Sequence, residues 1–268
     1  MSETAKSLST LQQRMCRQNF VLPTNKDEVI ARHKARALLF AQTEQGVAVM
    51  SDFQANRSYI FVGALGKSLG LPVDSELSDA AFETSLFQHV RDTDLLSRHI
   101  LELRFSELLK GLPVAERSHY VMLNTLHFAA APITSEGATK ATEPPLIPVL
   151  HRAYYLESLE SGAVWLSLCL YTPFVELPVP INSIVNNETG QEVSAASFQQ
   201  LDQRMLSRRE REVLTLIGQG QSSRQIAEQL HIAVNTVSRH RQNILQTLQV
   251  QNTAAAVEIA TRLHLLLT

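Results

Sequence analysis

The stretch that decides the fold runs from Leu206 to Val257 and has the sequence LSRREREVLTLIGQGQSSRQIAEQLHIAVNTVSRHRQNILQTLQVQNTAAAV. Ser207 with Glu210, and Ser222 with Gln225, have the spacing of capping boxes, which satisfy free N–H groups where a helix begins. Apolar residues follow each box at helical spacing. The stretch therefore predicts four short helices, of which the second and third form a helix-turn-helix.

The third helix, expected over residues 234–248 after a turn at 231–233, has two contrasting sides. At 100° per residue, Val237, Ile244 and Leu248 form a narrow apolar stripe. The opposite side carries polar side chains and no acid: Asn235, Ser238, Arg239, Gln242 and Gln246. Arg can pair with guanine in the major groove, and Gln or Asn with adenine. This side is either a DNA-binding surface or an ordinary solvated face of a small helical bundle.

The same stretch resembles the DNA-binding domain of LuxR-type bacterial transcription regulators. About fifty residues are covered, and many positions agree with the pattern of that family. The agreeing residues are Leu206, Arg209, Glu210, Glu212, Val213, Leu214, Gly220, Ile226, Ala227, Leu230, Ile232, Thr236, Val237, His240, Arg241, Asn243, Ile244, Leu248 and Val250. A match of this length is far more specific than a short motif.

The resemblance implies which side chains meet DNA. Positions just after Thr-Val reach base edges in the family, and here they are Ser238, Arg239 and Gln242. Thr236 and Arg241 would face phosphates or brace the helix, while His240 is either a phosphate contact or a packing residue. The predicted DNA-binding set is Asn235, Thr236, Ser238, Arg239, His240, Arg241 and Gln242.

Four residues depart from the family pattern, and the first of them is Arg208, which replaces a usual Pro. Ala233 stands where a Ser often caps the third helix, so a cap typically worth ~1 kcal/mol is absent, and DNA phosphate could satisfy those N–H groups instead. Ser238 stands where Lys is common, which leaves the base preference open. Gln249 replaces a common Gly after the third helix.

The charge is divided unevenly along the chain. Its 268 residues carry a formal net charge of −2. From Leu206 onward there are seven Arg, no Lys and four Glu, which gives +3, whereas the other seventeen basic and twenty-two acidic residues give −5. An acidic body with a mildly basic end predicts two domains, with the phosphate-binding surface on the second. Weak affinity of one copy for DNA makes a dimer useful.

The cysteines and the hydropathy of the chain argue against a disulfide-rich protein, a zinc protein, a secreted protein and a membrane protein. Cys16 and Cys169 lie far apart, which supports neither a disulfide framework nor a zinc site. The first ten residues lack an apolar signal region, and no apolar run reaches transmembrane length. We expect a cytoplasmic protein that does not enter a membrane.

The N-terminal part alternates helices and strands. A helix is expected from Asn25 to about Gln45, capped by Thr24 or Asn25, within a helical segment of residues 1–45. Strands are expected at 47–52 and 57–62, a short helix at 64–69 and a long helix from Asp92 to Lys110. Three longer strands follow at 119–131, 146–157 and 164–171, with an exposed loop over 132–145.

This order resembles a PAS domain, an antiparallel five-stranded sheet with helices over one face, and in particular PAS sensors joined to LuxR-type ends. The resemblance rests on HVRDTD at 89–94, LELRFSELLKGLPVAERSHY at 101–120 and WLSLCLYTPF at 165–174. The predicted fold class is α+β, with a PAS-like sensory domain over 46–174, a hairpin and linker over 175–205, and a four-helix LuxR-type domain over 206–268.

PAS pockets can hold haem, flavin or small metabolites, and each can be compared with the residues present. Neither cysteine lies in the motif that flavin photosensors use. His89 and His99 could ligate haem, but structural roles are favoured, and Cys169 is expected as a small buried side chain. We predict no fixed cofactor and no metal.

The last helix is expected over 253–267, capped by Asn252. Its apolar stripe resembles the one that LuxR-type domains use to dimerise on DNA, although packing within its own domain is the alternative. The predicted dimerisation residues are Ala254, Val257, Ala260 and Leu263.

The favoured function is a bacterial transcription regulator that binds a two-fold site in double-stranded DNA as a homodimer. A small-molecule or protein signal at the N-terminal domain would control it. A protein-interaction module and a phosphorylation-controlled response regulator are the alternatives, although Asp52 lacks the early acidic pair that a phosphoacceptor needs. An acyl-homoserine-lactone receptor is disfavoured by the single Trp. No nucleophile–base pair or phosphate loop indicates an enzyme.

Overall fold

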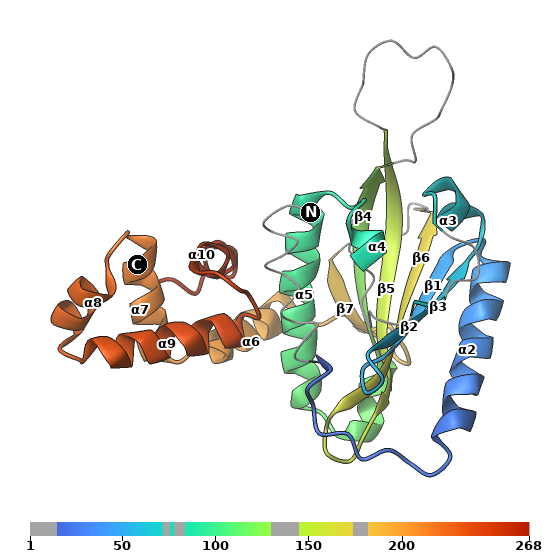
Figure 1. Ribbon diagram of the computed structural model, residues 1–268, viewed down its shortest axis with the longest axis horizontal. Coiled ribbons are helices and arrows are strands. Elements are labelled where there is room, and N and C mark those ends of the chain that lie inside the picture. The colour runs from blue at the N-terminus through green and yellow to red at the C-terminus, as the bar shows by residue number, and fades with distance from the viewer. Residues whose placement is uncertain (1–14, 72–75, 78–83, 130–144, 174–181, 268) are drawn as a thin grey trace.

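The computed structural model describes residues 15–71, 76–77, 84–129, 145–173 and 182–267 (Figure 1). An antiparallel sheet with helices on both sides makes up the N-terminal part, and an arm of short helices makes up the C-terminal part. The α+β class predicted from the sequence is confirmed. The loop expected over 132–145 lies outside the described residues except for its last residue, and so do residues 175–181 of the expected hairpin and linker.

Within the described residues, seven strands form the sheet, in the order β3-β2-β1-β6-β5-β4-β7. Their bounds are β1 Val47–Asp52, β2 Arg57–Val62, β3 Glu76–Leu77, β4 Tyr120–Ala129, β5 Leu146–Ser158, β6 Val164–Pro173 and β7 Ser183–Asn186. All neighbours pair antiparallel. The five strands predicted from the sequence are present, and β3 and β7 extend the sheet at its two edges.

The sheet buries both faces, which corrects the expectation of helices over one face. Helix α2 (Lys26–Thr43) covers one face, where Ala37 and Ala41 pack with Ala48 and Leu170. Asn25 occupies the N-cap of α2, as expected, but its side chain makes no capping hydrogen bond. The strand β1 is buried at every position because helices lie on both sides of it.

Helices α3 (Ala64–Ser68), α4 (Thr84–Phe87) and α5 (Asp92–Lys110) accompany the other face, where the largest core cluster includes Val49, Phe105 and Tyr155. The rings of Phe105 and Tyr155 lie 5.0 Å apart between centroids. The 3-10 segment η1 (Val114–His119) then leads into β4. Arg91 holds the N-cap of α5, and Asp94 in its first turn accepts a hydrogen bond from the His127 backbone N–H.

Helix α5 is buried on two sides, and its second side packs against the C-terminal helices. Leu96, Ile100 and Leu103, at helical spacing, belong to the same buried cluster as Met205 and Leu248. An apolar pattern that surrounds a helix, as it does here, is the signal that the helix lies between two cores.

Polar contacts reinforce this junction. Arg104 forms a bidentate pair with Asp202, with donor–acceptor distances of 2.9 and 2.6 Å, and Asp202 is buried. His99 is also buried, and its Nε2 lies 3.0 Å from the carbonyl oxygen of Leu248. His99 is therefore a structural residue of the junction. This is the role that the sequence analysis favoured over that of a haem ligand.

Five helices make up the C-terminal arm: α6 Ala195–Met205, α7 Arg208–Gly218, α8 Ser223–Leu230, α9 Val234–Thr247 and α10 Thr253–Arg262. Four of them are the helices predicted from the sequence, although α10 ends five residues earlier than expected. Residues 195–205, which lie in the linker expected over 175–205, form α6, and Ser194 is its N-cap. None of the helices that the structure describes combines the length and the apolarity that a membrane span needs.

Candidate nucleic-acid interface

The helix-turn-helix consists of α8, a three-residue turn and α9. His231 takes a left-handed conformation with φ of 53°, and the Ile232 N–H donates to the Ala227 carbonyl at 3.0 Å. The left-handed residue and this hydrogen bond turn the chain sharply, and Ile226 and Val237 on the two helices are buried. The turn lies at the residues predicted from the sequence.

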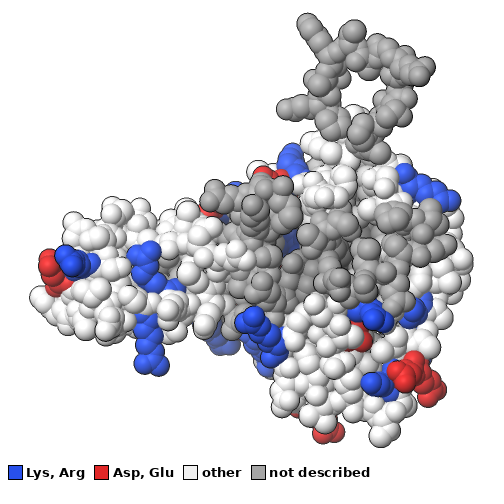
Figure 2. All heavy atoms as spheres, viewed as in Figure 1, with Lys and Arg blue, Asp and Glu red and all other residues white. Residues whose placement is uncertain are grey.

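Helix α9 separates its side chains as predicted. Val237 and Ile244 are buried in the arm. The opposite side is exposed and holds Asn235, Ser238, Arg239, Gln242 and Gln246, and Thr236 beside it is also exposed. No acid occurs between Val234 and Thr247. Figure 2 shows basic side chains projecting from the edge of the arm along which α9 runs in Figure 1. This surface can donate to phosphates and base edges without repelling them.

Two other predicted DNA-binding residues are half-buried. Arg241 donates to the hydroxyls of Ser223 at 3.4 Å and Thr253 at 3.1 Å, and so connects α9 to α8 and α10. These two hydrogen bonds hold the guanidinium against the neighbouring helices, and the role of Arg241 toward DNA stays a prediction. The Nδ1 atom of His240 is buried and has no hydrogen-bond partner among the described residues.

The first turn of α9 differs from its neighbours. Among the helices described between residues 195 and 262, only α9 lacks a side-chain hydrogen bond at its N-cap, which is Ala233. Its first backbone N–H groups thus lack the usual side-chain acceptor, and Val234 beside them is 42% exposed. An N-terminus of this kind favours an anion such as a phosphate.

Acidic residues of the arm stabilise the scaffold. Ser207 and Glu210 form the predicted capping box, as do Ser222 and Gln225. Hydrogen bonding by Arg209, at 2.7 Å, is the largest cause of the lowered pKa of Glu212. Arg209 also donates to the Leu230 carbonyl at 2.7 Å and so fixes α7 against the end of α8.

The capping box at the start of α7 supplies a test of the scaffold. Ser207→Ala should lower the free energy of unfolding by about 1 kcal/mol, because the Glu210 N–H loses its acceptor. Urea denaturation followed by circular dichroism measures the change. Ser238→Ala removes the same hydroxyl from mid-helix, where it bonds only to the Val234 carbonyl, and should change stability by a few tenths of a kcal/mol at most. Equal losses in the two variants would contradict the capping role.

Of the four residues predicted to form the contact between two copies, two are buried and two are not. Ala260 and Leu263 lie in the core of the arm, at 0% and 3% exposure. Ala254 is exposed and Val257 is half-buried near Gly218. Packing within the domain, the alternative considered for this stripe, therefore accounts for two of its four residues. Only Ala254 and Val257 are available to a second copy in this arrangement.

Asp52 and Cys169, the other residues that the sequence offered as candidates, are buried in strands of the sheet. The Asp52 side chain is buried and accepts a hydrogen bond from the Ala55 N–H at 3.0 Å in the turn between β1 and β2. Cys169 is buried in the sheet, as expected for a small apolar side chain. Within the described ranges, no group of three or more His, Cys, Asp or Glu side chains has the arrangement of a metal site.

Comparison with known proteins agrees with the geometry of the arm. The family model described as "Bacterial regulatory proteins, luxR family" matches residues 204–260. These residues are a LuxR-type helix-turn-helix domain. The match includes α7, α8 and α9 in full and most of α10. The resemblance stated from the sequence is confirmed for this part of the chain.

Two relatives illustrate the extent of the match. The chain is 38% identical over 86 residues to the oxygen regulatory protein NreC of Staphylococcus carnosus, which covers 32% of this chain and 38% of that protein. It is 43% identical over 75 residues to the transcriptional regulatory protein DegU of Brevibacillus brevis, which covers 26% and 32%. The chain thus spans less than half the length of these relatives. Among solved structures, the phage VqmA–DPO complex matches 88% of this chain and 89% of that one, with 13% identity and a TM-score of 0.29.

Proposed function

We propose that this chain is a bacterial transcription regulator in which the LuxR-type domain inserts α9 into the major groove of DNA. The observation that carries the proposal is the exposed, acid-free side of α9 within a domain of this family. Ser238, Arg239 and Gln242 contact base edges. Asn235, Thr236 and His240 lie beside the phosphates, and Arg241 holds α9 in position.

The N-terminal sheet acts as a PAS-like sensory domain in this proposal. Its central five strands are antiparallel and have helices packed against them, as the resemblance to PAS domains implies. Helix α5 supports the sensory role because it contributes to the sheet core on one side and to the arm on the other. A signal that moves α5 would therefore change the position of the DNA-binding domain.

Two copies bind a two-fold DNA site, since one domain with a charge of only +3 would hold DNA weakly. Ala254 and Val257 on α10 are the candidate contacts between copies. A regulator of chromosomal genes in a bacterium acts in the cytoplasm. The proposal involves no catalytic step.

Two alternatives predict different outcomes. A protein-interaction module would use the same α9 surface on a protein rather than on DNA. A response regulator controlled by phosphorylation would need an accessible phosphoacceptor, and Asp52 is 2% exposed and engaged in a turn. The acid-free side of α9 favours a polyanion, so DNA is preferred over a protein partner.

Selection of bound DNA from a random library by the full-length protein tests the proposal. A two-fold motif is the expected result, and failure to enrich any motif would favour the interaction module. Affinity for the selected site should also fall steeply with salt, by a slope of about −0.9 in log K against log salt for each neutralised phosphate. A flat salt response would contradict DNA binding through Arg side chains.

A further inference from the structure

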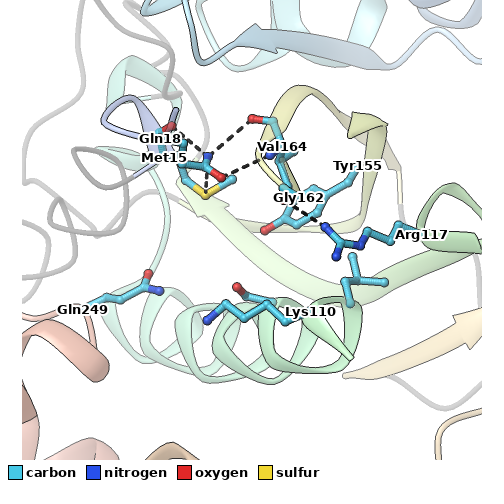
Figure 3. Close-up of a pocket in the computed structure, with 10 residues that line it drawn as sticks. Met15, Gln18, Lys110, Arg117, Tyr155, Gly162, Val164 and Gln249 are labelled. Atoms are coloured by element: carbon cyan, nitrogen blue, oxygen red, sulfur yellow. Dashed lines mark hydrogen bonds between the residues drawn. The ribbon is translucent and has the colours of Figure 1, made fainter. Parts of the chain in front are cut away.

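A cavity of about 200 Å³ lies at the junction between the sheet and the DNA-binding domain (Figure 3). Its walls come from the C-terminal half of α5, from η1, from the hairpin between β5 and β6, and from the segment around Met15 and Gln18. Gln249, the second residue after α9, closes another side. Elements from both domains therefore surround one space.

Two buried side chains that line this cavity carry polar atoms without a hydrogen-bond partner in the described part of the chain. Tyr155 is 6% exposed and Gln249 is 7% exposed. The Tyr155 hydroxyl and the Gln249 Oε1 atom have no hydrogen-bond partner among the residues that the structure describes. Figure 3 shows the Tyr155 hydroxyl turned toward α5 and the Gln249 amide turned toward Lys110. Buried polar atoms are nearly always satisfied, so this pair indicates a site for a ligand.

The charged side chains that line the cavity are both cationic in the described part of the chain: Lys110 and Arg117. Arg117 is held by hydrogen bonds from Nε to the Leu112 carbonyl and from Nη1 to the Gly162 carbonyl, at 3.2 and 2.9 Å. Lys110 pairs with Glu107 in the preceding turn and is 61% exposed, so it stands at the mouth. Leu109 and Val164 add apolar surface. This lining suits an apolar body that carries an oxyanion.

Gln249 occupies a backbone conformation that glycine adopts more easily. Its φ is 56°, in the left-handed region, where a side chain adds strain. The strained residue nevertheless carries a side chain that reaches the cavity and leaves its oxygen unpaired. A ligand that donates to this oxygen would hold the end of the recognition helix against α5.

We propose that this cavity binds a small organic oxyanion, a carboxylate or a phosphate ester with an apolar body, which clamps the DNA-binding domain onto the sheet domain. Arg117 and Lys110 neutralise the oxyanion, the Tyr155 hydroxyl donates to it, and the Gln249 oxygen accepts from a donor group of the ligand. The regulatory meaning of this clamp rests on the proposed function, but the binding itself does not.

The test titrates three probes into the full-length protein without DNA: benzoate, phenyl phosphate and the neutral analogue benzamide. Isothermal titration calorimetry should show binding of benzoate or phenyl phosphate, and benzamide should bind about tenfold more weakly. The comparison of the two anions identifies which oxyanion fits. Failure of both anions to bind, or equal binding of benzamide, would overturn the proposal. Because DNA is absent, this failure is distinct from failure of the DNA-binding proposal.

Three variants locate the site. Tyr155→Phe and Lys110→Met should each weaken binding of the anion about fivefold or more. Lys67→Met, which removes an exposed lysine from α3 away from the cavity lining, should leave the affinity unchanged. Tyr155→Phe keeps the ring against Phe105 and removes an unpartnered hydroxyl, so its melting temperature should equal or exceed that of the parent. Unchanged affinity in Lys110→Met would place the anion elsewhere and overturn the proposal.

Hydrogen exchange tests the clamp. The bound anion should slow exchange of the amides of residues 248–250 and of α6, because it ties the two domains together. Gln249→Gly, which relieves the left-handed strain, should abolish this protection while the variant remains folded. The same protection in Gln249→Gly and in the parent would show that Gln249 does not take part, and would overturn the clamp.

Discussion

Arg239→Ala should weaken binding to the selected DNA site by about 1–3 kcal/mol, roughly 5- to 150-fold in Kd, because a guanidinium can pair bidentately with guanine. Arg239 is exposed on the acid-free side of α9, two residues after Val237, which is buried. On random DNA the loss should be smaller, since only the attraction of the charge to phosphate is removed. Fluorescence anisotropy with the selected site and with a scrambled duplex measures both values.

Arg262→Ala is the matched control for charge. Arg262 lies on α10 and pairs with Glu258, so its removal takes away one positive charge without touching the exposed side of α9. The control should lower both affinities slightly and equally. If Arg239→Ala also weakens both duplexes equally, Arg239 contacts phosphate and the base contact assigned to it is wrong.

Between neutral pH and pH 4, the stability of His99→Gln relative to the parent should shift in favour of the variant by about 3 kcal/mol. Burial is the largest cause of the lowered pKa of His99, which falls from 6.5 to about 4. The unfolded chain therefore binds the proton more tightly than the folded one. The contribution of neutral His99 to stability is fully present above pH 6.5 and is lost as the pH falls toward 4. Gln does not titrate and can still donate to the Leu248 carbonyl.

Denaturant unfolding of both proteins at pH 7.5, 6, 5 and 4 tests this expectation. The difference between the two free energies of unfolding should move in favour of the variant as the pH falls. His151 is also buried with a lowered pKa, but it is present in both proteins and cancels in the difference. His89→Gln changes a histidine that is not fully buried and serves as the control. A difference that does not vary with pH would show that His99 is protonated as easily in the fold as outside it.

The helix-turn-helix could be predicted from the sequence because its signals are local. Ser207 and Glu210 are three residues apart, and so are Ser222 and Gln225, so a single helical turn specifies each cap. The 3.6-residue period places Val237 and Ile244 on one side of α9 and Arg239 on the other. These relations depend on spacing along one helix and not on contacts with residues that are distant in the sequence. The structure shows them as predicted.

Contacts between distant segments could not be predicted from spacing along one helix. Arg104 and Asp202 are 98 residues apart, and His99 and Leu248 are 149 apart, so their pairing depends on how the two domains meet. For the same reason, the partner of the apolar stripe on α10 could not be predicted. Its helical spacing was recognisable, but whether Ala260 faces its own core or a second copy depends on where α7 and α9 lie.

The sequence by itself determined helix α9, the polar residues on its outer side and the strands at the centre of the sheet, since periodicity and capping act within a few residues. Only the tertiary structure decided that α5 serves two cores, that Arg241 hydrogen-bonds to α8 and α10, and that Gln249 lines a cavity together with Tyr155. Burial and pairing of side chains from separate elements arise when those elements pack, and no pattern along one element specifies its partner.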